Sequence, residues 1–202
     1  MKDKIKQAIK TYNKIAKIYS EHTENILMQY QLSKFSSLLS GKKILDAGCA
    51  SGRDAAYFFE DGFDVVGVDI SESMIKLAKK KIKKAKFKVM DFRKMSFKDK
   101  SFDGIWSMAS LVHIDRSQIS KVLKEFFRVL SSKGILYISV KEGNGDEEIR
   151  QVKYENEPRH FFYFKKDEFE KYLTDAGFSV LTSEVSELES GTKWLEIFAK
   201  KN

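Results

Sequence analysis

Two glycines follow an apolar run in this sequence, in a pattern that could bring a ligand close to the backbone. The run Ile44–Ala47 leads into Gly48, and Gly52 stands four positions later. Glycine has no side chain, so a ligand can approach such a turn closely, and the N–H groups at the start of the following helix face it. A dinucleotide fingerprint would read G-x-G-x-x-G, but Ala50 takes the middle place, which weakens the interpretation as a pyrophosphate site. A tight turn without a ligand is the alternative for this pattern taken alone.

An acidic residue stands about 20 positions after the glycine turn, where a bound nucleoside would place its ribose. The run Val65–Val68 ends in Asp69, whose carboxylate can accept hydrogen bonds from both vicinal ribose hydroxyls and would repel a 2′-phosphate. The next apolar run also leads to an acid, Asp91, followed by Phe92. With Asp46 in the first run, three consecutive runs end in acid-containing turns. This arrangement favours a nucleoside site over surface solvation.

Short apolar runs rich in β-branched residues alternate with helical patterns along most of the chain. Runs this apolar are typical of strands buried on both faces, and the alternation predicts right-handed crossovers in a parallel sheet. We therefore predict an open, doubly wound α/β sheet that binds ligands beyond the carboxyl ends of its strands. The seven predicted strands are Lys43–Ala47, Phe63–Val68, Phe87–Met90, Phe102–Met108, Ile135–Val140, Phe178–Val185 and Lys193–Lys200, and the helices among them are Gly52–Asp61, Ser71–Lys84, Ser117–Ser131 and Lys165–Ala176.

Two further helices are predicted before the first strand, and one polar loop late in the chain. A polar loop is expected from Lys141 to about Arg159. The second helix is expected to end before Gly41, which suits a helix C-cap. Apolar residues recur at helical spacing at Ile5, Ile9, Tyr12, Ala16 and Tyr19 in the first helix and at Ile26, Tyr30, Leu38 and Leu39 in the second.

The composition favours an ordinary globular protein of one domain. The chain has 202 residues, of which 42% are hydrophobic and 33% charged, and no apolar run approaches the roughly 20 residues that span a bilayer. Residues Met1–Ser20 carry charges throughout and lack the apolar core of a signal peptide. The only cysteine, Cys49, has no disulfide partner, and no His/Cys cluster has metal-ligand spacing. We expect a cytoplasmic protein that binds neither a metal nor a membrane.

The net charge of +8 raises the question of a polyanionic partner. The densest lysine run, Lys79–Lys88, is interrupted by apolar residues, and Met74, Ala78 and Ile82 fall on one helical stripe. No aromatic residues are interleaved with the run as a base-stacking platform would need. The pattern favours a solvated helix face, and nucleic-acid binding stays a less favoured alternative.

Five segments form an ordered series of motifs: Leu45–Gly52, Val66–Ser71, Asp91–Phe92, Ser101–Met108 and Val129–Leu136. This series resembles that of the class I S-adenosylmethionine-dependent methyltransferases, particularly the small single-domain members, and the likeness runs from about Tyr12 to Lys200. Several motifs in the right order make a far more specific signal than one glycine turn. The family resemblance implies S-adenosylmethionine as the cofactor and S-adenosylhomocysteine as the product.

The resemblance also implies an architecture. It predicts a mostly parallel, seven-stranded sheet with the last strand antiparallel, helices on both faces and an N-terminal helical lid. We expect one methyltransferase domain over residues 1–202. Within it, residues 1–40 would form the lid, 41–140 the cofactor-binding core, 141–163 an acceptor-side insertion, and 164–202 the last helix and strands.

The glycine loop would bind the methionine and ribose parts of the cofactor. By the resemblance, Gly48 and Gly52 line these parts, Asp46 supports the loop, and Cys49 is a buried member of it. Arg53 opposes the helix dipole in the first helical turn, at a cost of about 0.3–1 kcal/mol. An ion pair between Arg53 and the cofactor's carboxylate would offset that cost. The alternative is that the Arg53 side chain points into solvent.

The later strands would bind the adenosine. The resemblance implies that Asp69 holds the ribose hydroxyls while Ile70 and Met74 pack on the adenine. It further implies that Asp91 accepts a hydrogen bond from the adenine amino group, and that Phe92 supplies a backbone contact and a wall.

Three further parts of the pattern bear on the methionine end. Ser107 and Met108 would lie near the methionine amino group. Tyr12 and Tyr19 resemble tyrosines of the family's lid helix, with plain core packing as the alternative. Ala50 departs from the family pattern, which usually has glycine there, so its methyl group could crowd the ligand.

Methyl transfer from a sulfonium requires chiefly alignment, and it needs a base only if the acceptor carries a proton. His113 follows the fourth predicted strand and is a weak candidate for that base; the alternative is a helix-start histidine bonded to backbone or to Asp115. His160 and Arg159 are further candidates, and Arg159 could orient an anionic acceptor. Phe161–Tyr163 either walls the acceptor pocket or forms an ordinary strand.

The acceptor is predicted to be a small molecule. Methylation of exocyclic base amines usually goes with an Asn/Asp-Pro-Pro-aromatic run after the fourth strand, where this chain reads Ser107-Met108-Ala109-Ser110. Alternatives are an RNA- or protein-directed methyltransferase, a non-catalytic S-adenosylmethionine-binding module, and a nicotinamide-dependent oxidoreductase, against which the missing third glycine speaks.

Overall fold

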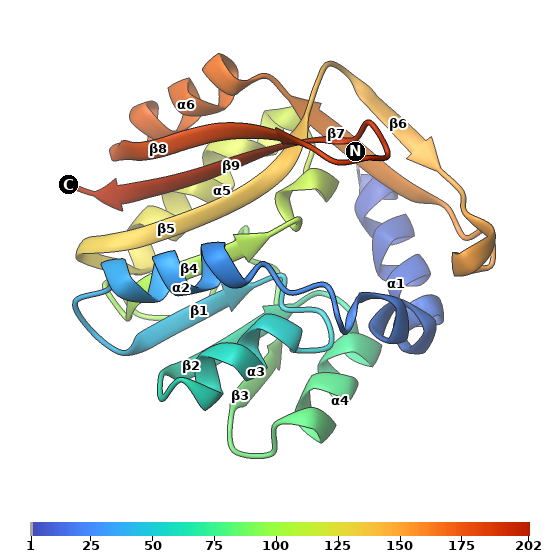
Figure 1. Ribbon diagram of the computed structural model, residues 1–202, viewed down its shortest axis with the longest axis horizontal. Coiled ribbons are helices and arrows are strands. Elements are labelled where there is room, and N and C mark those ends of the chain that lie inside the picture. The colour runs from blue at the N-terminus through green and yellow to red at the C-terminus, as the bar shows by residue number, and fades with distance from the viewer. Residues whose placement is uncertain (1) are drawn as a thin grey trace.

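The computed structural model describes residues 2–202, so Met1 of the predicted lid segment lies outside the described residues. Strands and helices alternate through the middle of the chain, as predicted (Figure 1). The helices are α1 (Lys2–Thr23), α2 (Gln29–Leu38), α3 (Arg53–Glu60), α4 (Glu72–Lys81), α5 (Arg116–Val129) and α6 (Lys166–Asp175), with short 3₁₀ turns η1 (Leu111–His113) and η2 (Val152–Tyr154). The strands are β1 (Lys43–Ala47), β2 (Asp64–Asp69), β3 (Lys86–Val89), β4 (Phe102–Met108), β5 (Leu130–Glu142), β6 (Asp146–Ile149), β7 (Arg159–Phe164), β8 (Phe178–Glu187) and β9 (Lys193–Lys201).

The strands form one mixed sheet in the order β3-β2-β1-β4-β5-β7-β6, and β9 pairs with both β5 and β8. Strands β1 to β5 pair with one another in parallel. Strand β9 is antiparallel to β5, which confirms the predicted direction of the last strand. The described residues hold nine strands rather than the seven predicted. The two additional strands, β6 and β7, form an antiparallel hairpin.

The β6–β7 hairpin corrects the expectation of a polar loop up to Arg159. Strand β6 is Asp-Glu-Glu-Ile, and its first three residues are exposed at the edge of the sheet. An exposed edge strand carries no alternating apolar pattern, so no strand could be predicted there from the sequence. Strand β7 reads Arg-His-Phe-Phe-Tyr-Phe, which confirms the strand interpretation of Phe161–Tyr163.

Helices cover both faces of the sheet, as a doubly wound fold requires. On one face, α2, α3 and α4 bury Phe35, Phe58 and Ile75 against Ile44 of β1 and Trp106 of β4. On the other face, α5 and α6 pack against a second cluster that includes the next residue of β1, Leu45. Because successive side chains of a strand point to opposite faces, the continuous apolar run of β1 serves both clusters.

The strand order reverses at β1. Strands β2 and β3 lie on one side of β1 and β4 and β5 on the other, which leaves a crevice at the carboxyl ends of β1 and β4. Helix α1 lies at this end of the sheet (Figure 1). It is tied to the hairpin by Thr11, whose hydroxyl donates to the Pro158 carbonyl at 2.8 Å, and to the start of α4 by Asn13, whose side-chain oxygen accepts from the Ser71 hydroxyl at 2.8 Å.

The stripe predicted for the second helix is wrong. Helix α2 buries Leu32 and Phe35, whereas Tyr30 is 69% exposed and Ile26 lies before the helix. Gly41 is not its C-cap, because α2 ends at Leu38 with an extended residue following. Leu32 and Phe35, which form the buried face of α2, are separated by two polar residues in the sequence. The predicted stripe therefore followed exposed apolar residues around them instead.

The lysine run from Lys79 to Lys88, which begins in the last turn of α4, is solvated, as predicted. Met74 and Ala78 are buried within α4 and Ile82 directly after it, whereas the lysines from Lys79 to Lys88 are exposed. Among residues 2–202, no helix is long and apolar enough to cross a membrane.

Candidate functional site

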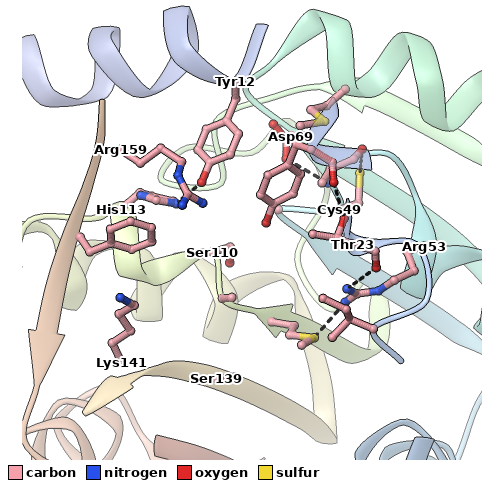
Figure 2. Close-up of a pocket in the computed structure, with 18 of the residues that line it drawn as sticks. Tyr12, Thr23, Cys49, Arg53, Asp69, Ser110, His113, Ser139, Lys141 and Arg159 are labelled. Carbon is pink, nitrogen blue, oxygen red and sulfur yellow. Dashed lines mark hydrogen bonds between the residues drawn. The ribbon is translucent and has the colours of Figure 1, made fainter. Parts of the chain in front are cut away.

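A cavity of about 460 Å³ opens at the carboxyl ends of β1, β2, β4 and β5, where the fold places a ligand. Figure 2 shows two groups of side chains around it. Tyr12, His113, Lys141 and Arg159 gather on one side, and Asp69, Cys49 and Arg53 lie on the other, with Ser110 between them. We name the two sides after the groups that the family resemblance predicts there: the acceptor end holds Tyr12, His113, Lys141 and Arg159, and the cofactor end holds Cys49, Arg53 and Asp69.

The glycine turn after β1 is held open by backbone geometry at the cofactor end. Gly48 has φ +87°, and its N–H donates to the Val68 carbonyl at 2.8 Å. A Cβ at Gly48 would lie 2.3 Å from Cβ of Ser110. Glycine is therefore required both for its conformation and for the space that Ser110 occupies. Ala50 also has positive φ, at +46°, which explains why the family prefers glycine at that place.

Asp69 joins this turn to the end of β2. One carboxylate oxygen accepts from the Ala50 N–H at 3.0 Å and the other from the Ser71 N–H at 2.8 Å. Burial raises the pKa of Asp69, and the backbone donors oppose that rise. A carboxylate has about four lone-pair positions, so capacity remains for donors of a ligand in the cavity.

Asp46 presents an unpartnered oxygen at the cofactor end. It lines the cavity while only 2% exposed, and its Oδ2 has no hydrogen-bond partner in the structure. Burial and the neighbouring Asp54 carboxylate raise its pKa well above the usual range, with Arg53 opposing them. A buried acceptor without a donor is costly, so this oxygen is suited to a ligand's N–H or ammonium group.

Arg53 does not point into solvent, which was the alternative considered for it. Its Nε donates to Asp54 at 2.7 Å, Nη1 to the Thr23 carbonyl at 3.3 Å, and its side chain is 17% exposed. The Trp106 indole N–H also donates to Asp54, at 2.9 Å. These contacts keep Arg53 beside the cavity, and they leave its predicted bond to a cofactor carboxylate as a prediction.

Most of the predicted cofactor residues line the cavity, and three do not. Gly52 is the left-handed N-cap of α3 and packs against Ala78 and Phe87. Ser107 is buried and bonds to the Ser110 hydroxyl at 2.6 Å. Those that line it are Tyr12, Tyr19, Asp46, Gly48, Cys49, Arg53, Asp69, Ile70, Met74, Phe92 and Met108.

Asp91 is the third predicted cofactor residue that does not line the cavity, and Arg93 holds its carboxylate. The Arg93 Nε lies 2.9 Å from both carboxylate oxygens, and its backbone N–H donates to one of them. Burial raises the pKa of Asp91, but the bonds from Arg93 outweigh it and lower that pKa overall. A bond from Asp91 to an adenine amino group stays a prediction.

Cys49 is a buried thiol at the cavity wall, 6% exposed. Burial and the nearby Asp46 and Asp69 carboxylates raise the pKa of this thiol well above its usual value. A thiol that stays protonated is a poor nucleophile, in line with its predicted structural character. Among the described residues, no group of three His, Cys, Asp or Glu side chains could hold a metal ion.

His113 and Tyr12 form a hydrogen-bonded pair at the acceptor end. The His113 Nδ1 lies 2.7 Å from the His160 carbonyl, and Nε2 lies 2.8 Å from the Tyr12 hydroxyl. Because a carbonyl only accepts, the proton is on Nδ1, and Nε2 accepts from Tyr12. The backbone bond was predicted; the partner Asp115 was not found, since that carboxylate accepts from Ser117 at the start of α5.

Burial lowers the pKa of His113 to about 4, and the charges of Arg159 and Lys141 act in the same direction. The imidazole is therefore neutral at physiological pH. Burial raises the pKa of Tyr12, so its hydroxyl keeps its proton. His160, the other predicted candidate, bonds to Asp146 at 2.5 Å and does not line the cavity.

Several cavity residues were not identified from the sequence. Ser110 lies just after β4, and Ser139 and Lys141 lie near the carboxyl end of β5. The signal for Lys141 was available, because a lysine directly at the carboxyl end of an apolar strand faces the ligand side of such a sheet. Arg159 and Phe161, by contrast, were candidates from the sequence; they share one side of β7 and both line the cavity.

Known proteins resemble this chain in sequence and in fold. A family profile described as a methyltransferase domain matches residues 45–138. Malonyl-[acyl-carrier protein] O-methyltransferase of Salmonella typhimurium is 27% identical over 151 residues, which are 73% of this chain and 59% of that protein. Ubiquinone biosynthesis O-methyltransferase of Pelagibacter ubique is 33% identical over 119 residues, 57% of this chain and 49% of that protein. The chain thus spans less than two thirds of these two curated relatives.

A solved structure covers more of the chain. A structure of S-adenosylmethionine-dependent methyltransferases from Methanosarcina mazei has a TM-score of 0.76 at 27% identity, covering 85% of this chain and 96% of that one. The sheet order, glycine turn and terminal acid define a Rossmann-like protein built to hold a nucleoside. In sequence and fold the chain resembles the class I S-adenosylmethionine-dependent methyltransferases.

The two glycines Gly48 and Gly62 provide a matched test of the glycine turn. Both have positive φ, but a Cβ at Gly62 would meet nothing within 4 Å. We expect Gly62→Ala to cost about 1–2 kcal/mol of unfolding free energy from backbone strain alone. Gly48→Ala adds a clash worth about 1–3 kcal/mol, for which Ser110 must move. Urea denaturation of both variants measures the difference, and equal losses would show that the turn has room for a side chain.

The buried His113 predicts a loss of stability in acid. The unfolded chain binds a proton at this residue near pH 6.5, whereas the folded chain binds it only near pH 4. Between these values the unfolded state holds more protons, so stability falls as pH is lowered through this window, by about 3 kcal/mol in total. His113→Asn removes this contribution. Unfolding free energies measured from pH 4 to 7 should decline more steeply for the wild type, and parallel curves would contradict the assignment.

Proposed function

We propose that this chain transfers the methyl group of S-adenosylmethionine to a small nucleophilic acceptor. The observation that carries the proposal is the Asp69 carboxylate, held by the Ala50 and Ser71 N–H groups at the edge of the cavity beside an open glycine turn. The similarity to methyltransferases supports the reaction class, and the geometry of the cavity supports the roles proposed for its residues.

The cofactor end fits this ligand in shape and in charge. Asp69 has lone pairs free for two ribose hydroxyls, and the unpartnered Oδ2 of Asp46 fits an ammonium group. Gly48 lines the cavity, and its missing side chain leaves the space that Ser110 fills. Asp54 is paired with Arg53, which leaves the carboxyl groups of Asp46 and Asp69 as the acidic groups available to a ligand that carries a sulfonium and an ammonium.

When bound, S-adenosylmethionine supplies an activated methyl group on a sulfonium. The chain's own residues then have to orient the acceptor and exclude water. Helix α1 and the β6–β7 hairpin contribute Tyr12, Tyr19 and Arg159 to the wall opposite the strand ends, which encloses the reacting groups. In-line approach at about 3 Å gains chiefly from such orientation.

His113 acts in this proposal as a positioning residue and not as a general base. Its Nδ1 donates to backbone, its Nε2 accepts from Tyr12, and its pKa of about 4 makes it a weak base at neutral pH. Its contribution is to fix the Tyr12 hydroxyl at the acceptor end. An acceptor that is already deprotonated at neutral pH suits such a site.

The acceptor is proposed to be small because the cavity is confined. At about 460 Å³ it falls in the range of small-molecule sites, and α1 and the hairpin line it. The exposed lysines of residues 79–88 form a solvated face without a stacking platform, which gives an RNA acceptor no specific support.

A labelling experiment tests the proposal. We expect the purified protein to bind S-adenosylhomocysteine in calorimetry and to show no binding of NAD. Incubated with methyl-labelled S-adenosylmethionine and a cell extract, it should move label into the small-molecule fraction. Label in RNA or protein would contradict the choice of acceptor, and cofactor binding without any transfer would indicate a non-catalytic module.

A further inference from the structure

The acceptor end of the cavity holds two buried cations that have no carboxylate partner. Arg159 is 8% exposed and Lys141 is 9% exposed. Every other arginine of the chain, at positions 53, 93, 116, 128 and 150, forms an ion pair with an aspartate or a glutamate. Within residues 4–202, Arg159 alone among the arginines does not.

The hydrogen-bond donors of these two cations are incompletely used. Arg159 donates from Nη2 to the Gln151 side chain at 2.5 Å, while its buried Nε has no partner. Among the described residues, the Lys141 Nζ forms one hydrogen bond, to the Tyr163 hydroxyl at 3.3 Å. A buried donor without an acceptor is costly, and more so when it is charged. Both of these incompletely bonded cations lie in the wall of the cavity, where a ligand could supply the missing acceptors.

Aromatic rings hold both cations in place without neutralising them. The Arg159 guanidinium lies 4.2 Å from the centre of the Tyr154 ring, and the Lys141 ammonium lies 4.3 Å from that of Phe161. Such contacts are attractive and partly offset desolvation, but they supply no anionic oxygen. The cations are thus fixed in position before any ligand binds, which lowers the entropy cost of binding.

The acids near the acceptor end are engaged elsewhere. Glu147 is exposed and accepts from the Tyr163 hydroxyl, which links it to Lys141 without a direct ion pair. Glu196 also lines the cavity, where it accepts from Gln31 at 3.0 Å and from Tyr137 at 3.2 Å. Asp69 belongs to the cofactor end. No carboxylate of the described residues forms an ion pair with Arg159 or Lys141, so an anion from outside the chain is their fitting partner.

We propose that the methyl acceptor carries an anionic oxygen group, a carboxylate or a phosphate, which Arg159 and Lys141 bind while an apolar body packs on Phe161. This inference rests on the proposed function and specifies its acceptor. The guanidinium fork suits either anion, because both present two oxygens at matching spacing. Ile5, Ala8 and Ile149 line the same cavity and suit the apolar body.

The test uses small probes and protein saturated with S-adenosylhomocysteine. Benzoate, phenyl phosphate and benzyl alcohol share a ring and differ in charge. We expect calorimetry to show that at least one of the two anions binds about ten- to a hundredfold more tightly than the alcohol, as a charged hydrogen bond of about 1.5–3 kcal/mol implies. The tighter of the two anions identifies the head group. Equal binding of all three probes, or binding of none, would overturn the proposal.

Variants link the effect to the two cations. Arg159→Gln and Lys141→Met should each weaken the anion by about tenfold or more and leave benzyl alcohol unchanged. Arg150→Gln removes the same charge from the exposed end of the hairpin and should change nothing. Anion binding that survives both cavity variants would contradict the proposal.

Binding of S-adenosylhomocysteine separates this inference from the proposed function. We expect the wild type and all three variants to bind it with similar affinity, because neither cation belongs to the cofactor end; this also confirms that the variants fold. If the wild type does not bind it, the proposed function fails. If it binds and the anions show no preference, the proposed function stands and the anionic acceptor is rejected.

Discussion

The site depends on one interaction, the pair of hydrogen bonds that Asp69 accepts from the backbone. They connect the end of β2 with the glycine turn after β1, through Ala50, and with the start of α4, through Ser71. Ala50 sits in a left-handed conformation that costs about 1–2 kcal/mol, and the bond to Asp69 helps to hold it there. The same carboxylate faces the cavity, so the group that organises the loop is also available to a ligand.

Charge is distributed unevenly along the cavity, and this links its two ends. The cofactor end holds three aspartates and Arg53, which is paired with Asp54, while the acceptor end holds Lys141 and Arg159. In a site of low dielectric such groups act more strongly than in water. A cationic donor and an anionic acceptor, as proposed, would each meet side chains of the opposite kind.

The parts of the site that could be predicted are those that one stretch of sequence contains. Gly48 and Asp69 each follow an apolar strand directly, so parallel topology was enough to place them at one edge of the sheet. The acceptor end is different, since Tyr12, Lys141 and Arg159 come from three distant segments. Their proximity depends on how α1 packs on the β6–β7 hairpin, and the polar β6 strand gave no sequence signal. Gly52 packs against Ala78 and Phe87 and does not line the cavity, and these neighbours could not be inferred from the motif.

The most direct measurement of the central claim is the affinity of S-adenosylhomocysteine for Asp69→Ala, by calorimetry. The account predicts a loss of about ten- to a hundredfold, because charged hydrogen bonds to the ribose and the order of the turn disappear together. Asp64→Ala, an exposed residue at the other end of β2, should bind as the wild type does. If Asp69→Ala bound as tightly as Asp64→Ala, the carboxylate would have no part in holding the nucleoside, and the account would be contradicted.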